Sequence, residues 1–276
     1  MTWRLHINTM RFLSLITLLL LTFVASAQPK YKIDLTHWKL ELPSGYTASE
    51  WKLSNFEKDR FANPFFYIDP EDSAFVLEAY PVDGTSTAQY TKNMLREQMK
   101  PGSSSVNWTL KQGGVLEADF QVTEVTKDGR NYHKILLFQI QGRTSDEQTK
   151  ALGLEKNTGP PFLKIFWDNG EIRVVRKVLE EWNTLGNALL MKDSWEDGKG
   201  ESFRRDVDFN RAKIKIIAQE GKIEIQLDKQ RPIIFDDINV QQWYFENYFV
   251  AGNYLQTKEE GAKSIVKLYD LQVHHD

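Results

Sequence analysis

The chain contains no cysteine among its 276 residues. This absence excludes disulfide bonds, thiolate catalysis, iron–sulfur clusters and zinc sites built on cysteine. An excess of basic charge is also missing, because the net charge is −3, and −5 once Arg4 and Arg11 of an expected signal are removed. Such a balance provides no electrostatic footprint for nucleic acid. The mean hydropathy of −0.48 argues against a polytopic membrane protein.

Long hydrophobic runs are scarce, and the most apolar one lies near the N-terminus. Arg4 and Arg11 come before or at the start of an apolar run over 12–24, and Ala25-Ser26-Ala27 follows it. This order is typical of a cleaved secretory signal, and the run is too short to span a bilayer comfortably. We expect a signal peptide over 1–27 and a secreted or periplasmic protein. An uncleaved anchor is the alternative.

No segment shows a long 3.6-residue repeat, and a period of two dominates the rest of the chain. Apolar and polar residues alternate along 114–125 and along 264–273. Residues 213–228 indicate a hairpin, and residues 162–175 indicate a second one closed around Asp168-Asn169-Gly170. Asn-Gly is the strongest short signal for a hairpin turn.

The chain after residue 27 also lacks internal repeats, low-complexity linkers and composition breaks. We therefore expect residues 28–276 to form one all-β domain, an antiparallel β-sandwich of jelly-roll type. Residues 178–190 are expected to hold a short helix or an ordered loop.

Three expected strands carry polar side chains on the face that alternation turns away from the core. The residues on these faces are Arg96, Gln98, Lys100, Gln139, Gln141, Tyr248, Tyr254 and Gln256. In the middle strand, Leu136, Phe138 and Ile140 are expected to share the core face. Cations, amides and phenols on one concave sheet suit an anionic, hydroxyl-rich polymer. An ordinary solvated face is the alternative for any one strand.

These strands carry a family resemblance. The segment from Tyr248 to Gln256, YFVAGNYLQ, resembles the Y-F-K-A-G-x-Y-x-Q strand of the family 7 polysaccharide lyases, the alginate lyases. Residues 138–142, FQIQG, resemble their Q-I-H-G strand. Residues 96–100, REQMK, are a weaker match to R-S/T-E-L-R, and residues 38–43, WKLELP, resemble W-K-L-x-L-P.

The resemblance implies a β-jelly roll whose concave sheet binds a polyuronate and cleaves it by β-elimination. By this resemblance, Arg96 and Gln139 neutralise the uronate carboxylate, and Tyr254 is the catalytic tyrosine. Lys100 and Gln256 would hold flanking sugars, and Gln98 and Tyr248 are further candidates for substrate binding. Lys164 and Arg173, on the Asn-Gly hairpin, are further candidates for substrate contacts. The resemblance implies no cofactor and no metal.

The departures from the family pattern concern proton transfer. Gln141 stands where the family has histidine, and an amide cannot accept a proton near neutrality. Val250 stands where the family has lysine. Tyr254 is then left to act as base and acid in turn. A free tyrosine has a pKa near ~10, so this role is expected to need Arg96 nearby to favour the phenolate.

Other conspicuous residues give weaker hypotheses. Asp236-Asp237 and Glu180-Glu181 are paired acids, but neighbouring strand residues face opposite sides and cannot flank one glycosidic bond. His274 and His275 have no partner at metal-ligand spacing, so we expect a frayed tail rather than a metal site. Most of the tryptophans are expected to be core residues.

The sequence therefore predicts an exported, monomeric polysaccharide lyase acting on alginate or a related polyuronate. Its expected partner is an anionic polysaccharide, with no nucleic acid and no membrane after signal cleavage. Two alternatives remain open. One is a lyase for another uronate polymer such as glucuronan or ulvan, and the other is a non-catalytic carbohydrate-binding jelly roll.

Overall fold

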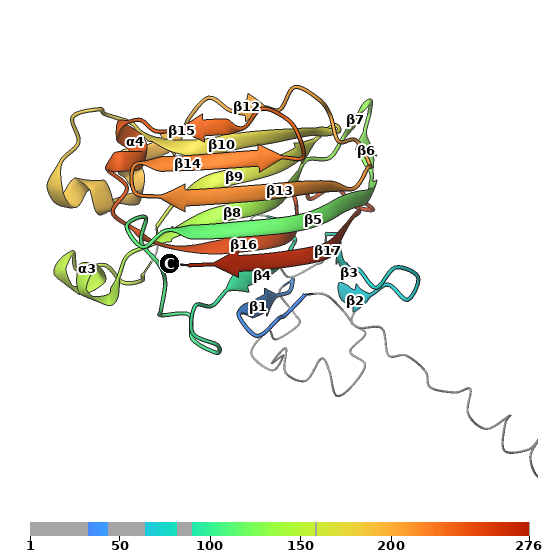
Figure 1. The fold of residues 1–276 in the computed structure, drawn as a ribbon, viewed down its shortest axis with the longest axis horizontal. Coiled ribbons are helices and arrows are strands. Elements are labelled where there is room, and N and C mark those ends of the chain that lie inside the picture. The colour runs from blue at the N-terminus through green and yellow to red at the C-terminus, as the bar shows by residue number, and fades with distance from the viewer. Residues whose placement is uncertain (1–32, 44–63, 82–89, 158, 276) are drawn as a thin grey trace, which may run out of the picture. The chain divides into compact units, whose positions relative to one another are not determined.

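The computed structural model describes residues 33–43, 64–81, 90–157 and 159–275 (Figure 1). The signal peptide expected over 1–27 lies outside the described residues. Among the residues that are described, no helix is long and apolar enough to cross a membrane.

Two antiparallel sheets pack face to face (Figure 1). The eight-stranded sheet has the order β1-β4-β16-β8-β9-β10-β11, with β12 pairing with β10. Its strands are β1 (Trp38–Glu41), β4 (Lys92–Glu97), β8 (Ile135–Arg143), β9 (Pro161–Asp168), β10 (Glu171–Leu179), β11 (Trp195–Asp197), β12 (Glu201–Ser202) and β16 (Glu246–Leu255). This sheet contains all three of the polar strands singled out from the sequence.

The seven-stranded sheet has the order β15-β14-β13-β5-β17-β3-β2. Its strands are β2 (Phe66–Ile68), β3 (Phe75–Ala79), β5 (Gly114–Val125), β13 (Ala212–Gln219), β14 (Lys222–Leu227), β15 (Ile233–Phe235) and β17 (Ser264–His274). The remaining elements are the small hairpin of β6 (Lys127–Asp128) and β7 (Asn131–Tyr132), the helices α3 (Asp146–Ala151) and α4 (Ile238–Gln241), and the 3-10 turns η2 (Gly186–Leu190) and η3 (Lys192–Ser194).

The all-β sandwich expected from the sequence is confirmed, and so are its most regular strands. β5 begins and ends at the residues that alternation indicated, and β13 and β14 form the expected hairpin. Asn169 and Gly170 close the hairpin of β9 and β10 with φ of 52° and 93°. Positive φ at both central residues is the geometry of a type I′ turn, which suits Asn-Gly. In the segment 178–190, a short 3-10 turn follows the end of β10.

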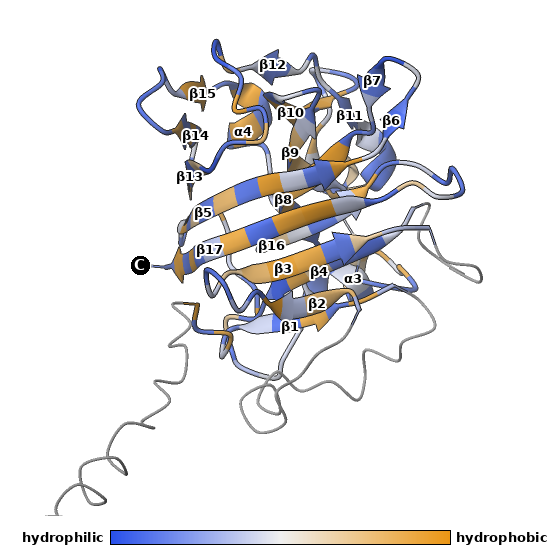
Figure 2. Cartoon of the chain, turned by 90° about the vertical axis from the view of Figure 1, so that its right-hand side faces the viewer, coloured by the Kyte–Doolittle hydropathy of each residue, from blue (hydrophilic) through white to orange (hydrophobic). Residues whose placement is uncertain are grey.

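The core lies between the sheets and is built from the alternating apolar residues of both (Figure 2). Trp108, Trp167, Trp195 and Trp243 are all buried, as expected for core tryptophans, whereas Trp182 is 82% exposed. Burial of apolar surface, to which large aromatic side chains contribute strongly, is the main favourable contribution to folding.

The alternation expected for the strand over 134–141 is wrong at one residue. Leu136 pairs with Phe166 and Phe138 with Ile165, so Leu137 is an extra residue that shifts the register. A β-bulge of this kind reverses the side on which the preceding residues lie. Leu136 therefore faces outward with Phe166 and Tyr254, while Leu137 and Phe138 belong to the core.

The expectation of a frayed tail is also wrong for His275. Its Nε2 contacts the Glu97 carboxylate, and its Nδ1 lies 3.0 Å from the Gly113 carbonyl oxygen. Glu97 is 2% exposed and also accepts hydrogen bonds from Trp108 Nε1 at 2.9 Å and Phe249 N at 2.8 Å. The residue that follows β17 therefore binds the end of β4 through the Glu97 carboxylate. A buried carboxylate requires partners of this kind, since its desolvation is otherwise costly.

Candidate functional site

One row of residues crosses the outer face of the eight-stranded sheet. Val250 on β16 pairs with Arg96 on β4 and with Gln139 on β8, and Gln139 pairs with Lys164 on β9. Residues paired across strands point to the same side. With strands roughly 4.8 Å apart, the row from Arg96 to Lys164 spans about 14 Å. The structure therefore brings together polar residues that are far apart in the sequence.

A second row lies closer to the C-terminal end of β16. Tyr254 pairs with Lys92 on β4 and with Leu136 on β8, so the three side chains share the outer face. The ring of Tyr254 makes an edge contact with Tyr90, with 6.3 Å between centroids. The Tyr254 hydroxyl makes no hydrogen bond with the described residues, so it is available to an external group.

Arg96 is held by its surroundings rather than by a carboxylate. Its guanidinium carbon lies 3.9 Å from the centroid of the Tyr248 ring, and Nη2 donates to the Ser104 carbonyl at 3.1 Å. Its buried Nε has no hydrogen-bond partner in the described part of the chain. No described carboxylate forms an ion pair with Arg96, and its charge interacts with the Glu41 carboxylate at longer range.

The expectation that Arg96 lies beside the phenol of Tyr254 is wrong. The partner of Arg96 is Val250, four residues before Tyr254 on β16, and the guanidinium stacks on Tyr248. Four strand residues correspond to about 13 Å. The cation directly opposite Tyr254 is Lys92, which is not among the site residues expected from the sequence. Extending the alternation of β4 two residues at a time from Arg96 would have reached it.

Lys92 is paired with a neighbouring acid on the first strand. Its Nζ lies 2.6 Å from Glu41 Oε2. Burial would raise the pKa of the Glu41 carboxyl, but the ammonium of Lys92 more than offsets this and lowers the pKa below its usual value. Glu41 is therefore ionised near neutrality, and it holds the Lys92 ammonium at the edge of the site.

The two glutamines of β8 differ in how their amides are used. Gln139 is half-buried and makes no hydrogen bond with the described residues. The Nε2 of Gln141 donates to the carbonyl oxygens of Gly159 at 2.8 Å and Gly142 at 3.2 Å. The amide nitrogen of Gln141 is thus engaged within the protein, and only its oxygen can accept a hydrogen bond from a ligand. The Gln139 amide can still donate to a ligand.

Tyr248 lies on the outer face opposite Gln141 and beneath Arg96. Burial raises the pKa of its phenol, and the nearby guanidinium of Arg96 only partly offsets that effect. A protonated ring under a guanidinium is the arrangement of a cation–π contact. Tyr248 therefore supports Arg96, in addition to any contact with a ligand.

The face shared by Arg96, Gln98 and Lys100 does not exist as expected, because β4 ends at Glu97. Gln98 is 7% exposed, and its amide contacts Gly102 N and Ser104 Oγ. Lys100 is exposed in the turn that follows. Gln98 thus shapes the loop after β4, and neither side chain continues the row of Arg96.

The remaining candidates lie around the same face. Lys164 continues the row of Gln139, and its Nζ forms an ion pair with Asp197. Arg173 pairs with Phe166 on the same side, and its guanidinium packs against Gly200. Gln256 follows the end of β16, and its Nε2 donates to the Tyr254 carbonyl at 3.0 Å. All three stay candidates for ligand contacts.

Gly252 is required by strand packing. Its φ is 148°, and an added Cβ would lie 2.6 Å from the Asn93 carbonyl oxygen and 2.9 Å from Leu77 Cδ2. Both distances are shorter than van der Waals contact. The glycine therefore keeps β16 close to β4 and to the opposite sheet, and in this way fixes where Tyr254 lies.

The adjacent acids considered for glycoside hydrolysis either make other contacts or lie exposed. Asp237 pairs with Arg176 and caps α4, while Glu180 and Glu181 are exposed. Within the described ranges, no group of three or more histidine or acidic side chains is placed to hold a metal ion.

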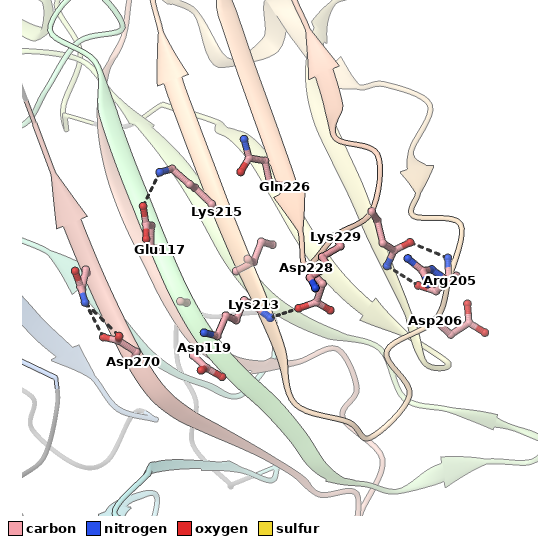
Figure 3. A pocket seen from close by; sticks show the side chains of 14 residues that line it. Glu117, Asp119, Arg205, Asp206, Lys213, Lys215, Gln226, Asp228, Lys229 and Asp270 are labelled. Atoms are coloured by element: carbon pink, nitrogen blue, oxygen red, sulfur yellow. Dashed lines mark hydrogen bonds and ion pairs between the residues drawn. The ribbon is translucent and has the colours of Figure 1, made fainter.

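A pocket of about 710 Å³ lies on the other sheet, away from these residues (Figure 3). Its lining carries charges of both signs, and some of these groups are paired with one another. Lys215 contacts Glu117 at 2.6 Å, and Asp228 accepts from the backbone N of Lys213 at 2.9 Å. Such a surface offers little net charge to a polyanion.

Two packed antiparallel sheets, with one outer face of cations, amides and phenols, define a β-sandwich whose polar face suits an anionic, hydroxyl-rich ligand. The family model described as alginate lyase matches residues 33–275, and the chain therefore belongs to the alginate lyase family, whose members are polysaccharide lyases. A comparison with curated proteins finds no match.

Solved structures share this fold. Alginate lyase A1-II′ of polysaccharide lyase family 7 is 23% identical, with a TM-score of 0.67 over 88% of this chain and 96% of that one. A variant of A1-II′ in complex with product is 22% identical, with a TM-score of 0.70 over 89% and 97%. Alginate lyase PA1167 from Pseudomonas aeruginosa is 17% identical, with a TM-score of 0.61 over 88% and 100%.

Proposed function

We propose that this lyase cleaves alginate, or a closely related polyuronate, by β-elimination on the outer face of its eight-stranded sheet. One observation carries the proposal. The Gln139 amide and the Tyr254 hydroxyl lie on adjacent strands of one face without hydrogen bonds to the described residues, and Lys92 and Arg96 lie on the next strand. Uncommitted polar groups beside positive charge suit an anionic, hydroxyl-rich ligand.

The reaction needs three functions at one sugar. A base removes the proton from C5, the C4–C5 double bond forms as the C4–O4 bond breaks, and an acid protonates the departing O4. Negative charge moves onto the uronate carboxylate as C5 loses its proton. Gln139 is the donor for this charge, and Arg96 adds positive charge from the same row, because fixed donors and cations act most strongly where charge develops.

Lys92 joins them as a second cation on β4. The family pattern R-S/T-E-L-R can also be laid on residues 92–96, KNMLR, where Leu95 and Arg96 match its last two positions. This register gives Lys92 the place of the first arginine. Its position opposite Tyr254 supports that reading, and Lys92 then acts on the charge next to the catalytic phenol.

Tyr254 is the proton-transfer group. Gln141 replaces the family histidine and cannot accept a proton near neutrality. Alginate lyase A1-II′ was obtained in complex with substrate as a variant in which one histidine became asparagine and one tyrosine became phenylalanine. One phenol can serve as both base and acid when the proton and the leaving oxygen lie on the same side of the sugar ring.

A non-catalytic binding protein is the second candidate, and the Gln141 contacts favour it. An amide fixed to the Gly159 carbonyl replaces the group that would have served as base. Such a site would keep its affinity for a polyuronate while turnover was lost.

The decisive experiment follows the ultraviolet absorbance of the unsaturated product on alginate, glucuronan and ulvan, in parallel with polymer binding. We expect product from alginate or from one of the other polyuronates. Binding without product on every polymer would replace the enzyme by the binding protein, and an absence of binding would overturn both.

We also propose that the protein is exported and acts as a monomer. The sequence over 1–27 supports export, since it has the order of a cleaved signal. Cell fractionation of the full-length chain and light scattering of the processed form test these statements. Cytoplasmic accumulation of the uncleaved chain would contradict the first, and a dimeric mass the second.

A further inference from the structure

A compact charge cluster lies at the far end of the Arg96 row. Asp197 on β11 forms ion pairs with two lysines, at 2.5 Å to Lys164 Nζ and 3.1 Å to Lys177 Nζ. Lys164 belongs to the outer face through its pairing with Gln139, so the cluster opens on the same side of the sheet. The three side chains come from β9, β10 and the edge strand β11.

The two lysines are buried more deeply than the acid that joins them. The side chains of Lys164 and Lys177 are 16% and 15% exposed, whereas that of Asp197 is 47% exposed. Two ammonium groups thus share one carboxylate, and the cluster keeps a net positive charge. Burial would raise the pKa of Asp197, but the two lysines more than offset this and lower it, so the acid is ionised near neutrality.

Other groups near the cluster do not change this balance. Lys164 Nζ lies 5.9 Å from the centroid of the Phe166 ring, and Lys177 Nζ also donates to the Trp195 carbonyl at 3.3 Å. Lys134, whose Nζ lies 5.6 Å from the same ring centroid, is paired with Asp168 at 2.8 Å. The exposed carboxylate of Asp197 is therefore the anion that a negatively charged ligand would meet first.

We propose that Lys164 and Lys177 form a second binding site for a uronate carboxylate, and that Asp197 is an internal anion competing with the substrate for it. The inference rests on the proposed function, because it assumes that a polyuronate lies along the row from Arg96 to Lys164. A carboxylate of the polymer would take over the position of Asp197 between the two ammonium groups. By this competition, Asp197 weakens polymer binding at the Lys164 end of the row, about 14 Å from Arg96.

The test uses substitutions with opposite expected effects in the full-length protein. Asp197→Asn keeps the shape and removes the competing charge, so KM for polymeric alginate should fall roughly three- to tenfold at low salt. Lys177→Met removes one cation and should raise KM by a similar factor. The double variant restores the wild-type net charge, and its KM should return to near the wild-type value.

Glu196→Gln is the matched control, because it removes the same charge from the exposed neighbouring residue. Its KM should change less than twofold, and high salt should reduce the effect of Asp197→Asn. kcat should stay unchanged in all four variants. An unchanged or higher KM in folded Asp197→Asn, or equal losses in both single variants, would overturn the inference in favour of a structural ion pair.

Failure of the proposed function can be told apart from failure of this inference. If no polyuronate is cleaved, the same variants are compared by their Kd for alginate and for its carboxyl-reduced, neutral form. Opposite shifts in Kd on alginate alone would still support the carboxylate site. Equal shifts on both polymers would contradict it.

Discussion

The outer faces of the two sheets are both polar, but they use their polar groups differently. On the seven-stranded sheet, Arg211 binds Asp119 through two hydrogen bonds, and Lys267 pairs with Asp69 and Asp72. On the eight-stranded sheet, the Gln139 amide and the Tyr254 hydroxyl have no such partners among the described residues.

This difference separates a solvated surface from a binding surface. The 710 Å³ pocket lies on the seven-stranded sheet, and its lining mixes acidic and basic side chains, with Lys215 paired to Glu117 (Figure 3). A ligand there would meet charges of both signs, whereas a ligand on the other sheet can also bind the Gln139 amide and the Tyr254 hydroxyl, which make no hydrogen bonds with the described residues. Uncommitted donors are therefore a better guide to the site than the size of a cavity.

The largest effect is expected for Tyr254→Phe, which removes only a hydroxyl from the eight-stranded sheet. Turnover should fall by ~10²–10⁴, the usual loss for a general acid or base. Stability should change by no more than about 1 kcal/mol, because the hydroxyl makes no hydrogen bond with the described residues. Rates, thermal melting and polymer affinity are measured together. A folded variant with more than about a tenth of the wild-type rate would contradict this role.

His275→Ala is expected to lower the stability of the protein, although His275 does not contact the candidate site. It removes the histidine from the buried Glu97 carboxylate at the point where the two sheets are joined. Breaking a buried pair from one side costs about 3 kcal/mol, because the other charge stays buried. Glu97→Gln combined with His275→Ala should cost less than the sum of the two single changes. Strictly additive losses in urea unfolding would show that the two residues do not interact.

A gain of roughly tenfold in turnover on alginate is expected for Gln141→His, below the ~10²–10⁴ that an established general base supplies. The Gly159 carbonyl, which now accepts from the Gln141 amide, can accept from one ring nitrogen and orient the other toward the face. Gln141→Asn is the control, because it adds no base. A drop in turnover would instead indicate a site rebuilt for another substrate.

The smallest effect is expected for Lys213→Ala, beside the pocket of the seven-stranded sheet. Its side chain is exposed, and only its backbone nitrogen bonds to Asp228. Turnover and polymer affinity should stay within about twofold of wild type. Lys92→Ala is the same substitution on the other face and should lower turnover at least about tenfold. Similar losses for both would remove the functional distinction between the two faces.

Much of this contrast could be read from alternation in the sequence, and its failures have local causes. The outward positions of Gln139, Tyr248 and Tyr254 follow from a period of two, as the structure confirms. Leu136 was placed on the wrong side because the bulge at Leu137 leaves no mark in the hydrophobic pattern. Lys100 was placed in a strand that ends three residues earlier.

The amino-acid sequence by itself determined the sandwich, its hairpins and the polar character of one sheet. These features depend on the alternation of apolar and polar residues and on turn residues, both of which are set by residues close together in the sequence. The tertiary structure decided which cation lies opposite Tyr254, that Asp197 sits between two lysines, and that His275 is bound to Glu97. Those contacts join residues from separate strands and both sheets, and strand register and sheet packing fix them only when the whole chain has folded.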